Sequence, residues 1–177
     1  MQINATKSCC IRIGRNHSHT PCNLHTLLNL DIQWFDQIRY LGVYIISRND
    51  FCCQIDHAKS SFYKCFNYIY GKIGNTASEE TLVHLIKTKC IPRLVYGLEC
   101  LTLNVSQIRS LDFALRSAFM KIFKTKELDI IIDCMSFFNV KDITSLLAIS
   151  KDKLFHRLRS GVNRVNLIDS VIVRLLQ

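Results

Sequence analysis

The chain has 177 residues, of which 49% are hydrophobic and 21% charged, so it can bury a core and does not have the composition of a disordered chain. Its 23 Lys and Arg outnumber its 14 Asp and Glu, and the formal charge of +9 favours polyanionic partners, mainly nucleic acid, although a basic surface without a specific partner is the alternative. Every apolar stretch is interrupted by a charge before it reaches ~18 residues, so we expect no membrane span. The first residues also lack the apolar centre of a secretory signal, so we expect an intracellular location, nuclear or cytoplasmic.

The first quarter of the chain has the patterns of short strands. Runs rich in β-branched, aromatic and cysteine residues predict strands over residues 8–13, 23–28, 31–35 and 38–46. The last run contains Gly42, and a glycine inside a strand pattern indicates a bulge or a close approach of two backbones. Together these strands predict a small antiparallel sheet.

From about residue 50 the apolar residues recur at steps of three and four, which is the period of a helix. This stripe predicts a helix over about residues 50–72, which Gly71 and Gly74 end through a left-handed cap. The segment Thr76-Ala77-Ser78-Glu79 then predicts a capping box, in which a Thr hydroxyl and a Glu carboxylate satisfy free amides at a helix start.

The helix after this capping box reaches about Cys90, and Pro92 kinks or ends it. Because proline is tolerated in a first turn, residues 92–101 can form another helical piece. Further cap signals and apolar stripes predict helices over residues 104–122, 130–138, 142–159 and 164–176. The fold class is therefore α+β, with a small N-terminal antiparallel β-sheet followed by a mainly α-helical bundle.

The 9 cysteines invite a disulfide or a metal interpretation. Without a secretory signal, free buried thiols fit better. The adjacent pairs Cys9-Cys10 and Cys52-Cys53 agree with this, since neighbouring residues on a strand point to opposite faces and do not form ordinary bridges.

Three classes of catalytic or metal site receive little support. Zinc-capable ligands gather in one loop at His17, His19, Cys22 and His25, but their spacing matches no common zinc module, and a polar surface loop explains them better. No nucleophile elbow and no Gly-rich phosphate loop is present. The acidic residues are scattered, whereas two-metal phosphoryl transfer needs them clustered. We therefore predict no cofactor, no metal and no catalytic residue in this chain.

Basic residues on the solvent faces of the predicted helices, with Tyr63, Tyr68 and Tyr70 nearby, could follow a phosphate backbone. Solvated helix faces beside aromatic core residues are an equally good explanation of the same pattern.

Several short motifs occur in a shared order and together resemble a known family. They are Lys7-Ser8, Cys10-Ile11-Arg12-Ile13-Gly14, Trp34, Tyr40-Leu41-Gly42-Val43, Phe62-Tyr63, Lys72-Ile73-Gly74, Ala77-Ser78-Glu79-Glu80, Lys87 to Pro92, Tyr96-Gly97-Leu98-Glu99, Ser110-Leu111-Asp112 and Lys121-Ile122-Phe123-Lys124. From about Lys7 to Phe138 the chain is similar to the end of the palm, and the segment after it, of reverse transcriptases from non-long-terminal-repeat (LINE-type) retrotransposons.

The resemblance implies a role for particular residues. Lys7 matches a lysine that lies near the incoming nucleotide phosphates, and Tyr40, Leu41 and Gly42 match the primer grip, a tight hairpin that holds the end of the growing strand. The helical part matches the thumb, which closes over the template–primer duplex and grips phosphates without reading sequence. The corresponding domains would be residues 1–47 (end of the palm with the primer-grip hairpin), 48–140 (thumb-like region) and 141–177 (helical C-terminal extension).

The resemblance places the catalytic aspartates of these polymerases ahead of the Lys7 match, outside this sequence. We therefore expect a part of an RNA-directed DNA polymerase that does not polymerise and at most binds RNA–DNA or RNA duplexes weakly and without sequence preference. The candidate contacts are Lys7, Arg12, Arg39, Tyr40, Gly42, Lys59, Lys64, Arg109, Arg116, Lys121 and Lys124. A protein-interaction or structural helical module, an enzyme that uses the His-rich loop, and a relic without function are the alternatives, and the oligomeric state stays open.

Overall fold

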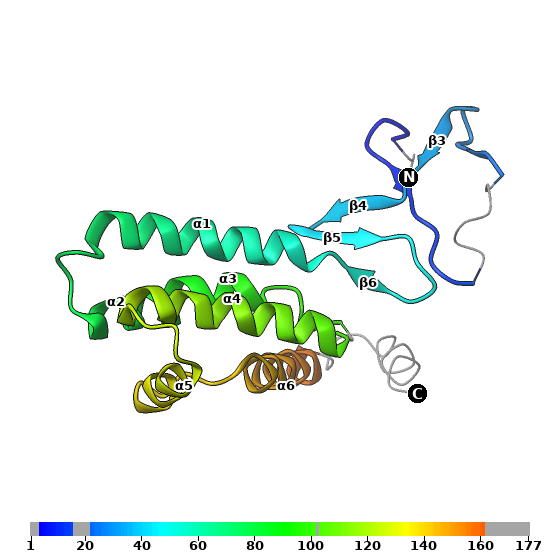
Figure 1. The fold of residues 1–177 in the computed structure, drawn as a ribbon. Coiled ribbons are helices and arrows are strands. Elements are labelled where there is room, and N and C mark those ends of the chain that lie inside the picture. The colour runs from blue at the N-terminus through cyan, green and yellow to red at the C-terminus, as the bar shows by residue number, and fades with distance from the viewer. Residues whose placement is uncertain (1–3, 16–21, 102, 162–177) are drawn as a thin grey trace.

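The computed structural model describes residues 4–15, 22–101 and 103–161, which fold into short strands followed by helices (Figure 1). The predicted α+β class is confirmed. The strands are β1 (Cys9–Cys10), β2 (Leu24–His25), β3 (Asp31–Trp34), β4 (Gln37–Tyr40), β5 (Val43–Ile46) and β6 (Cys52–Cys53). The helices are α1 (Ile55–Ile73), α2 (Glu79–Leu85), the π-helix η1 (Ile86–Cys90), α3 (Ile91–Val95), α4 (Val105–Phe123), α5 (Leu128–Phe137) and α6 (Ile143–Gly161).

The strands form two small sheets and not the single antiparallel sheet that the sequence predicts. The first has the order β1-β3-β2 and contains a parallel pair, β1 with β3. The second has the order β4-β5-β6 and is antiparallel throughout. Backbone and side-chain hydrogen bonds connect the two sheets, because Ser47 donates its hydroxyl to the carbonyl of Arg12 at 2.7 Å and Gly14 donates its amide to Arg48 at 2.9 Å.

The predicted strand over residues 38–46 is wrong, since this run is a hairpin. Tyr40 pairs with Val43, and Leu41 and Gly42 form the two-residue turn between β4 and β5. Both turn residues have a positive φ, 47° and 84°, as a tight hairpin with a right-handed strand twist requires. Gly42 therefore serves the turn and does not mark a bulge.

Helix α1 begins later than the apolar period predicts and its end differs from the predicted cap. Residues 52–53 pair with β5 and leave the helix to start at Ile55. Gly71 lies inside α1, and Gly74 follows it with a φ of −60°, so no left-handed glycine ends this helix. The next helix also lacks the predicted box at Thr76, because Ser78 is the N-cap and accepts a hydrogen bond from the amide of Thr81.

Helix α4 confirms the cap signal at Asn104, whose side chain accepts a hydrogen bond from the amide of Gln107 while the Gln107 side chain accepts one from the Asn104 amide. Lys124 ends α4 with a left-handed φ of 52°. Pro92 lies in the first turn of α3, which continues directly from η1, and α3 ends at Val95. The predicted helix over 164–176 lies outside the described residues.

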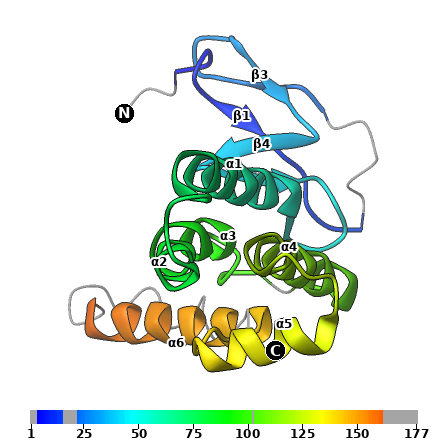
Figure 2. The ribbon, with the colours of Figure 1, turned by 60° about the vertical axis from the view of Figure 1, so that its left-hand side comes forward.

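The helices form layers beneath the second sheet (Figures 1 and 2). Helix α1 lies between that sheet and the layer of α2, α3 and α4, and helices α5 and α6 lie on the far side of that layer. Phe62 of α1, Leu94 of α3 and Phe119 of α4 are fully buried in the shared core. This core fixes α1 beside α4 and thereby positions the basic residues described below.

All nine cysteines are thiols, but few of them are buried as predicted. Cys53 and Cys90 are buried, while Cys9, Cys22 and Cys100 are exposed. Burial, together with the neighbouring Cys52 and Cys100 thiols, raises the pKa of Cys53 to about 11.

Candidate nucleic-acid interface

Helices α1 and α4 lie side by side and run in the same direction (Figure 1). Polar side chains join them along their length, and we call these residues the α1–α4 seam. The seam hydrogen bonds are Lys59 Nζ to Ser110 Oγ at 2.9 Å, Tyr63 Oη with Ser117 Oγ at 3.1 Å, and Lys121 Nζ to Asn67 Oδ1 at 3.4 Å. Two of the predicted contact residues, Lys59 and Lys121, thus come together in one seam.

Lys121 holds the two helices together as well as carrying charge. Its ammonium lies 4.8 Å from the centre of the Tyr70 ring and 5.6 Å from that of Phe66, within the range of cation–π attraction. Tyr70 in turn donates its hydroxyl to the carbonyl of Lys121 at 3.2 Å. A substitution at Lys121 would therefore disturb packing and charge at the same time.

Two of the predicted contact residues already have acidic partners. The Lys59 ammonium lies 2.8 Å from Asp56, and the Arg116 guanidinium lies 2.6 Å from Asp112. The hydrogen bond from Lys59 lowers the pKa of the Asp56 carboxyl, which keeps this partner charged. Lys59 and Arg116 consequently add less to the field outside the molecule than isolated cations would.

Lys64, Arg109 and Lys124 are among the cations of this region that are open to solvent. All three are exposed, and within the described parts of the chain none of them forms an ion pair. Lys64 projects from α1, Arg109 from the first turns of α4, and Lys124 from the residue that ends α4. They can neutralise phosphates without first giving up a carboxylate.

The β4–β5 hairpin carries three further predicted contact residues. The Arg39 guanidinium lies 5.9 Å from the Tyr44 ring centre, and Tyr40 is 62% exposed beside the turn at Gly42. The turn rests on the end of α3, since Tyr96 donates its hydroxyl to the carbonyl of Leu41 at 3.2 Å. An aromatic side chain is therefore open to solvent at the tip of an anchored hairpin.

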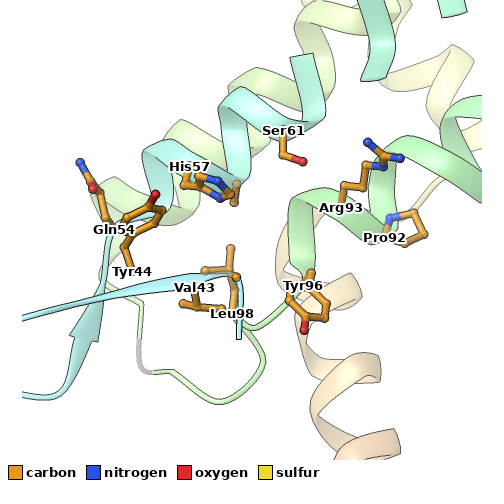
Figure 3. A pocket seen from close by; sticks show the side chains of 11 residues that line it. Val43, Tyr44, Gln54, His57, Ser61, Pro92, Arg93, Tyr96 and Leu98 are labelled. Carbon is orange, nitrogen blue, oxygen red and sulfur yellow. The ribbon is translucent and has the colours of Figure 1, made fainter. Parts of the chain in front are cut away.

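A cleft of about 360 Å³ lies between this hairpin, α1 and the turn after α3 (Figure 3). Its polar lining comes from Gln54 and from His57 and Ser61 of α1, with Arg93 of α3 at its edge. The residue patterns did not point to His57 or Arg93, and Tyr96 occurred only within the motif at residues 96–99, because only the fold brings α3 beside the hairpin. The sequence signal for a close approach of this turn to the hairpin is Gly97, within the motif at residues 96–99.

The remaining predicted contact residues belong to the first sheet. Lys7 lies exposed in the turn before β1, and Arg12 is half-buried where the two sheets meet. The predicted set thus divides among the α1–α4 region, the hairpin and the first sheet. The α1–α4 group surrounds the helical core, whereas the hairpin is joined to the end of α3 by the hydrogen bond from Tyr96 to Leu41.

The His-rich loop of the zinc alternative falls partly outside the described residues, which omit 16–21 and hence His17 and His19. His25 pairs with Asp31, and the carbonyl of Cys22 accepts a hydrogen bond from the Trp34 indole at 3.2 Å. In the described ranges, no three His, Cys, Asp or Glu side chains are grouped so that they could hold a metal ion. No helix in those ranges has the length and apolar character needed to cross a membrane.

Comparison with known proteins identified no relative, because no protein-family model, no curated protein and no solved structure matches the chain. The resemblance to reverse transcriptases therefore stays a prediction from the sequence motifs.

Proposed function

We propose that this chain binds nucleic-acid duplexes through their phosphates, in the manner of a polymerase thumb with its primer-grip hairpin. It acts on RNA–DNA or RNA duplexes, weakly and without sequence preference, as part of a LINE-type reverse transcriptase. The observation that carries this proposal is the placement of Lys64, Arg109 and Lys124 on neighbouring helices, exposed and without an acidic partner among the described residues.

The reach of these cations suits a phosphate backbone. Arg109 and Lys124 are 15 positions apart, which at 1.5 Å per residue is about 22 Å along α4. Phosphates of one strand follow each other at about 3.4 Å along a duplex axis, so this distance passes roughly six of them. Lysine and arginine contacts of this kind position a protein on a duplex but do not read its bases.

The acidic residues near these cations favour duplex binding over nucleotidyl transfer. Two of the carboxylates nearest to the cations, Asp56 and Asp112, are ion-paired with Lys59 and Arg116. Phosphoryl transfer by two metal ions needs carboxylates that converge on the ions. We therefore propose no nucleotidyl transfer by this chain, and primer extension by the purified protein would contradict that part of the proposal.

The test measures affinity for a labelled RNA–DNA hybrid by fluorescence anisotropy between ~50 and ~200 mM salt. The double variant Lys64→Gln, Arg109→Gln should bind more weakly, and its slope of log affinity against log salt should fall by about 2. Neither substitution removes a described ion pair or a buried side chain. Two hybrids of unrelated sequence should bind with equal affinity.

The matched control is the double variant Lys141→Gln, Lys153→Gln. Both lysines are exposed, Lys141 just before α6 and Lys153 within it, and α6 lies on the side of the bundle away from α1 (Figure 2). This control changes the net charge by the same amount and should keep the wild-type slope. An equal fall of the slope in both variants would show that only net charge matters and would contradict a defined interface.

A second candidate function is supported by apolar side chains on the first sheet. Leu27 is 100% exposed, Leu28 65% and Leu30 51%, in the turn between β2 and β3. Exposed apolar residues close together are typical of protein-interaction surfaces. If this surface is the functional one, the protein should elute from gel filtration as an oligomer that Leu27→Ser, Leu28→Ser dissociates; a monomer at all concentrations would exclude self-association as that function.

A further inference from the structure

Two thiols from separate helices meet inside the bundle. Cys65 belongs to α1 and Cys90 ends the π-helix η1, and their sulfur atoms are 3.6 Å apart. Cys90 is 0% exposed, whereas Cys65 is only partly buried. We propose that Cys65 and Cys90 form a redox pair that a peroxide or a small-molecule disulfide closes to a disulfide and that thiols reopen.

Cys90, at the end of the π-helix η1, lies on the buried side of that helix with its sulfur atom toward Cys65 of α1. A π-turn contains one residue more than an α-turn, so the residues after it are rotated by about 100° relative to a regular helix. Ile86 and Cys90, the first and last residues of η1, are both buried, while Lys87 and Lys89 between them are exposed. Such local departures from the α-helix are frequent at functional positions, which agrees with a role for the cysteine placed here.

The geometry requires only a small movement to form the bond. A disulfide has a sulfur–sulfur distance of about 2.05 Å, so the two sulfur atoms must approach each other by roughly 1.5 Å. Side-chain rotation at the partly exposed Cys65 can supply this approach, because Cys65 is less constrained by neighbours than Cys90. The bond would join residues 25 positions apart and tie α1 to the helices that lead into α3.

The reaction with hydrogen peroxide balances without any further reagent. The Cys65 thiolate attacks one peroxide oxygen, which yields a sulfenic acid at Cys65 and releases one water once protonated. The Cys90 sulfur then attacks the Cys65 sulfur and expels the hydroxyl group as a second water. The two sulfur atoms lose two electrons in total, and the peroxide gains them.

The environment of Cys90 sets the order of these steps. Burial, with a smaller contribution from the hydrogen bond to Cys65, raises the pKa of Cys90 to about 12, and the charge of Arg93 opposes this rise. Cys90 is therefore a neutral thiol near pH 7 and a poor first nucleophile. The partly exposed Cys65 reacts first, and the second step becomes faster as the pH rises.

The experiment exposes the full folded chain to a small excess of hydrogen peroxide and maps disulfides by mass spectrometry. We expect a Cys65–Cys90 link with the loss of two hydrogen atoms, about 2 Da. The melting temperature should rise by roughly 5–10 °C, because the link restricts the unfolded chain. A thiol reductant should reverse both changes.

Two variants separate the roles of the cysteines. In Cys90→Ala, Cys65 should accumulate as a sulfenic acid that dimedone traps, whereas in Cys65→Ser the buried Cys90 should stay a thiol. Cys134→Ser is the matched control, since Cys134 is a partly buried cysteine of α5 and should leave the link intact. The proposal is overturned if both thiols persist in the oxidised folded protein, or if the first disulfide joins other cysteines.

Discussion

Gly97 is the position at which a single methyl group most directly tests how the hairpin is anchored. It follows Tyr96 after the end of α3 and has a φ of +75°, a conformation that L-residues rarely adopt. A Cβ atom built at Gly97 would lie 2.4 Å from Cγ2 of Val43, the first residue of β5. Gly97→Ala therefore introduces both backbone strain and a collision with the hairpin.

The magnitude follows from these two contributions. A left-handed conformation costs an alanine about 1–2 kcal/mol, and forcing a methyl group into a packed contact adds about 1–3 kcal/mol. We expect Gly97→Ala to lower the free energy of unfolding by about 2–5 kcal/mol, which for a chain of this size corresponds to roughly 5–15 °C in melting temperature. Urea denaturation followed by circular dichroism measures this change.

Two further variants isolate the contact with the hairpin. Gly71→Ala is the matched control, because Gly71 lies inside α1 with nothing within 4 Å of a built Cβ, and it should stabilise the protein by about 0.5–1 kcal/mol. The double variant Gly97→Ala, Val43→Ala should recover part of the loss, since the colliding methyl group is then absent. If Gly97→Ala is neutral, or if Val43→Ala does not relieve it, the hairpin does not rest on this turn as described.

Three other changes have defined expected results. Gly42→Val should cost about 1 kcal/mol or more in urea denaturation, because a β-branched residue avoids the φ of +84°, and a neutral result would exclude the tight turn. Asn104→Ala should cost about 1 kcal/mol through loss of the capping box with Gln107, whereas Asn104→Asp should retain most of it. Burial raises the pKa of Cys53 from 9.0 to about 11, so the unfolded chain loses this proton first and stability falls between pH 9 and 11. Melting temperatures of Cys53→Ala should therefore decline less steeply over that range than those of the wild type, and parallel profiles would contradict the burial.

The helices were more predictable than the strands, for a physical reason. A stripe of apolar residues at helical spacing shows α1 and α4 directly, and the Asn104 cap is a local signal that needs no tertiary partner. The resemblance to the primer grip predicted a tight hairpin at Leu41-Gly42, but the strand pattern did not show it, because leucine is uncommon at a positive φ and the β-rich residues on both sides read as one strand. The π-helix η1 has no sequence pattern of its own and was not foreseen.

The candidate interface was predictable as a set of cations but not as an arrangement. The pairs Asp56 with Lys59 and Asp112 with Arg116 are three and four residues apart, so spacing alone could have shown that these charges are compensated. The contact of Lys121 with the Phe66 and Tyr70 rings could not be foreseen, because it depends on which face of α4 packs against α1. The cleft beside the hairpin depends in the same way on the return of α3 toward β5.

The common direction of α1 and α4 gives the molecule an electrical polarity. Each helix carries a macrodipole of about half an elementary charge at each end, positive at its N-terminus. Since the two helices start at the same end, beside the hairpin, these partial charges add there, and only Asp56 of α1 offsets them within the first turns. If the proposed duplex binding is correct, phosphates near the hairpin end would be attracted by these partial charges, and the axis of the bundle would favour one orientation of the duplex.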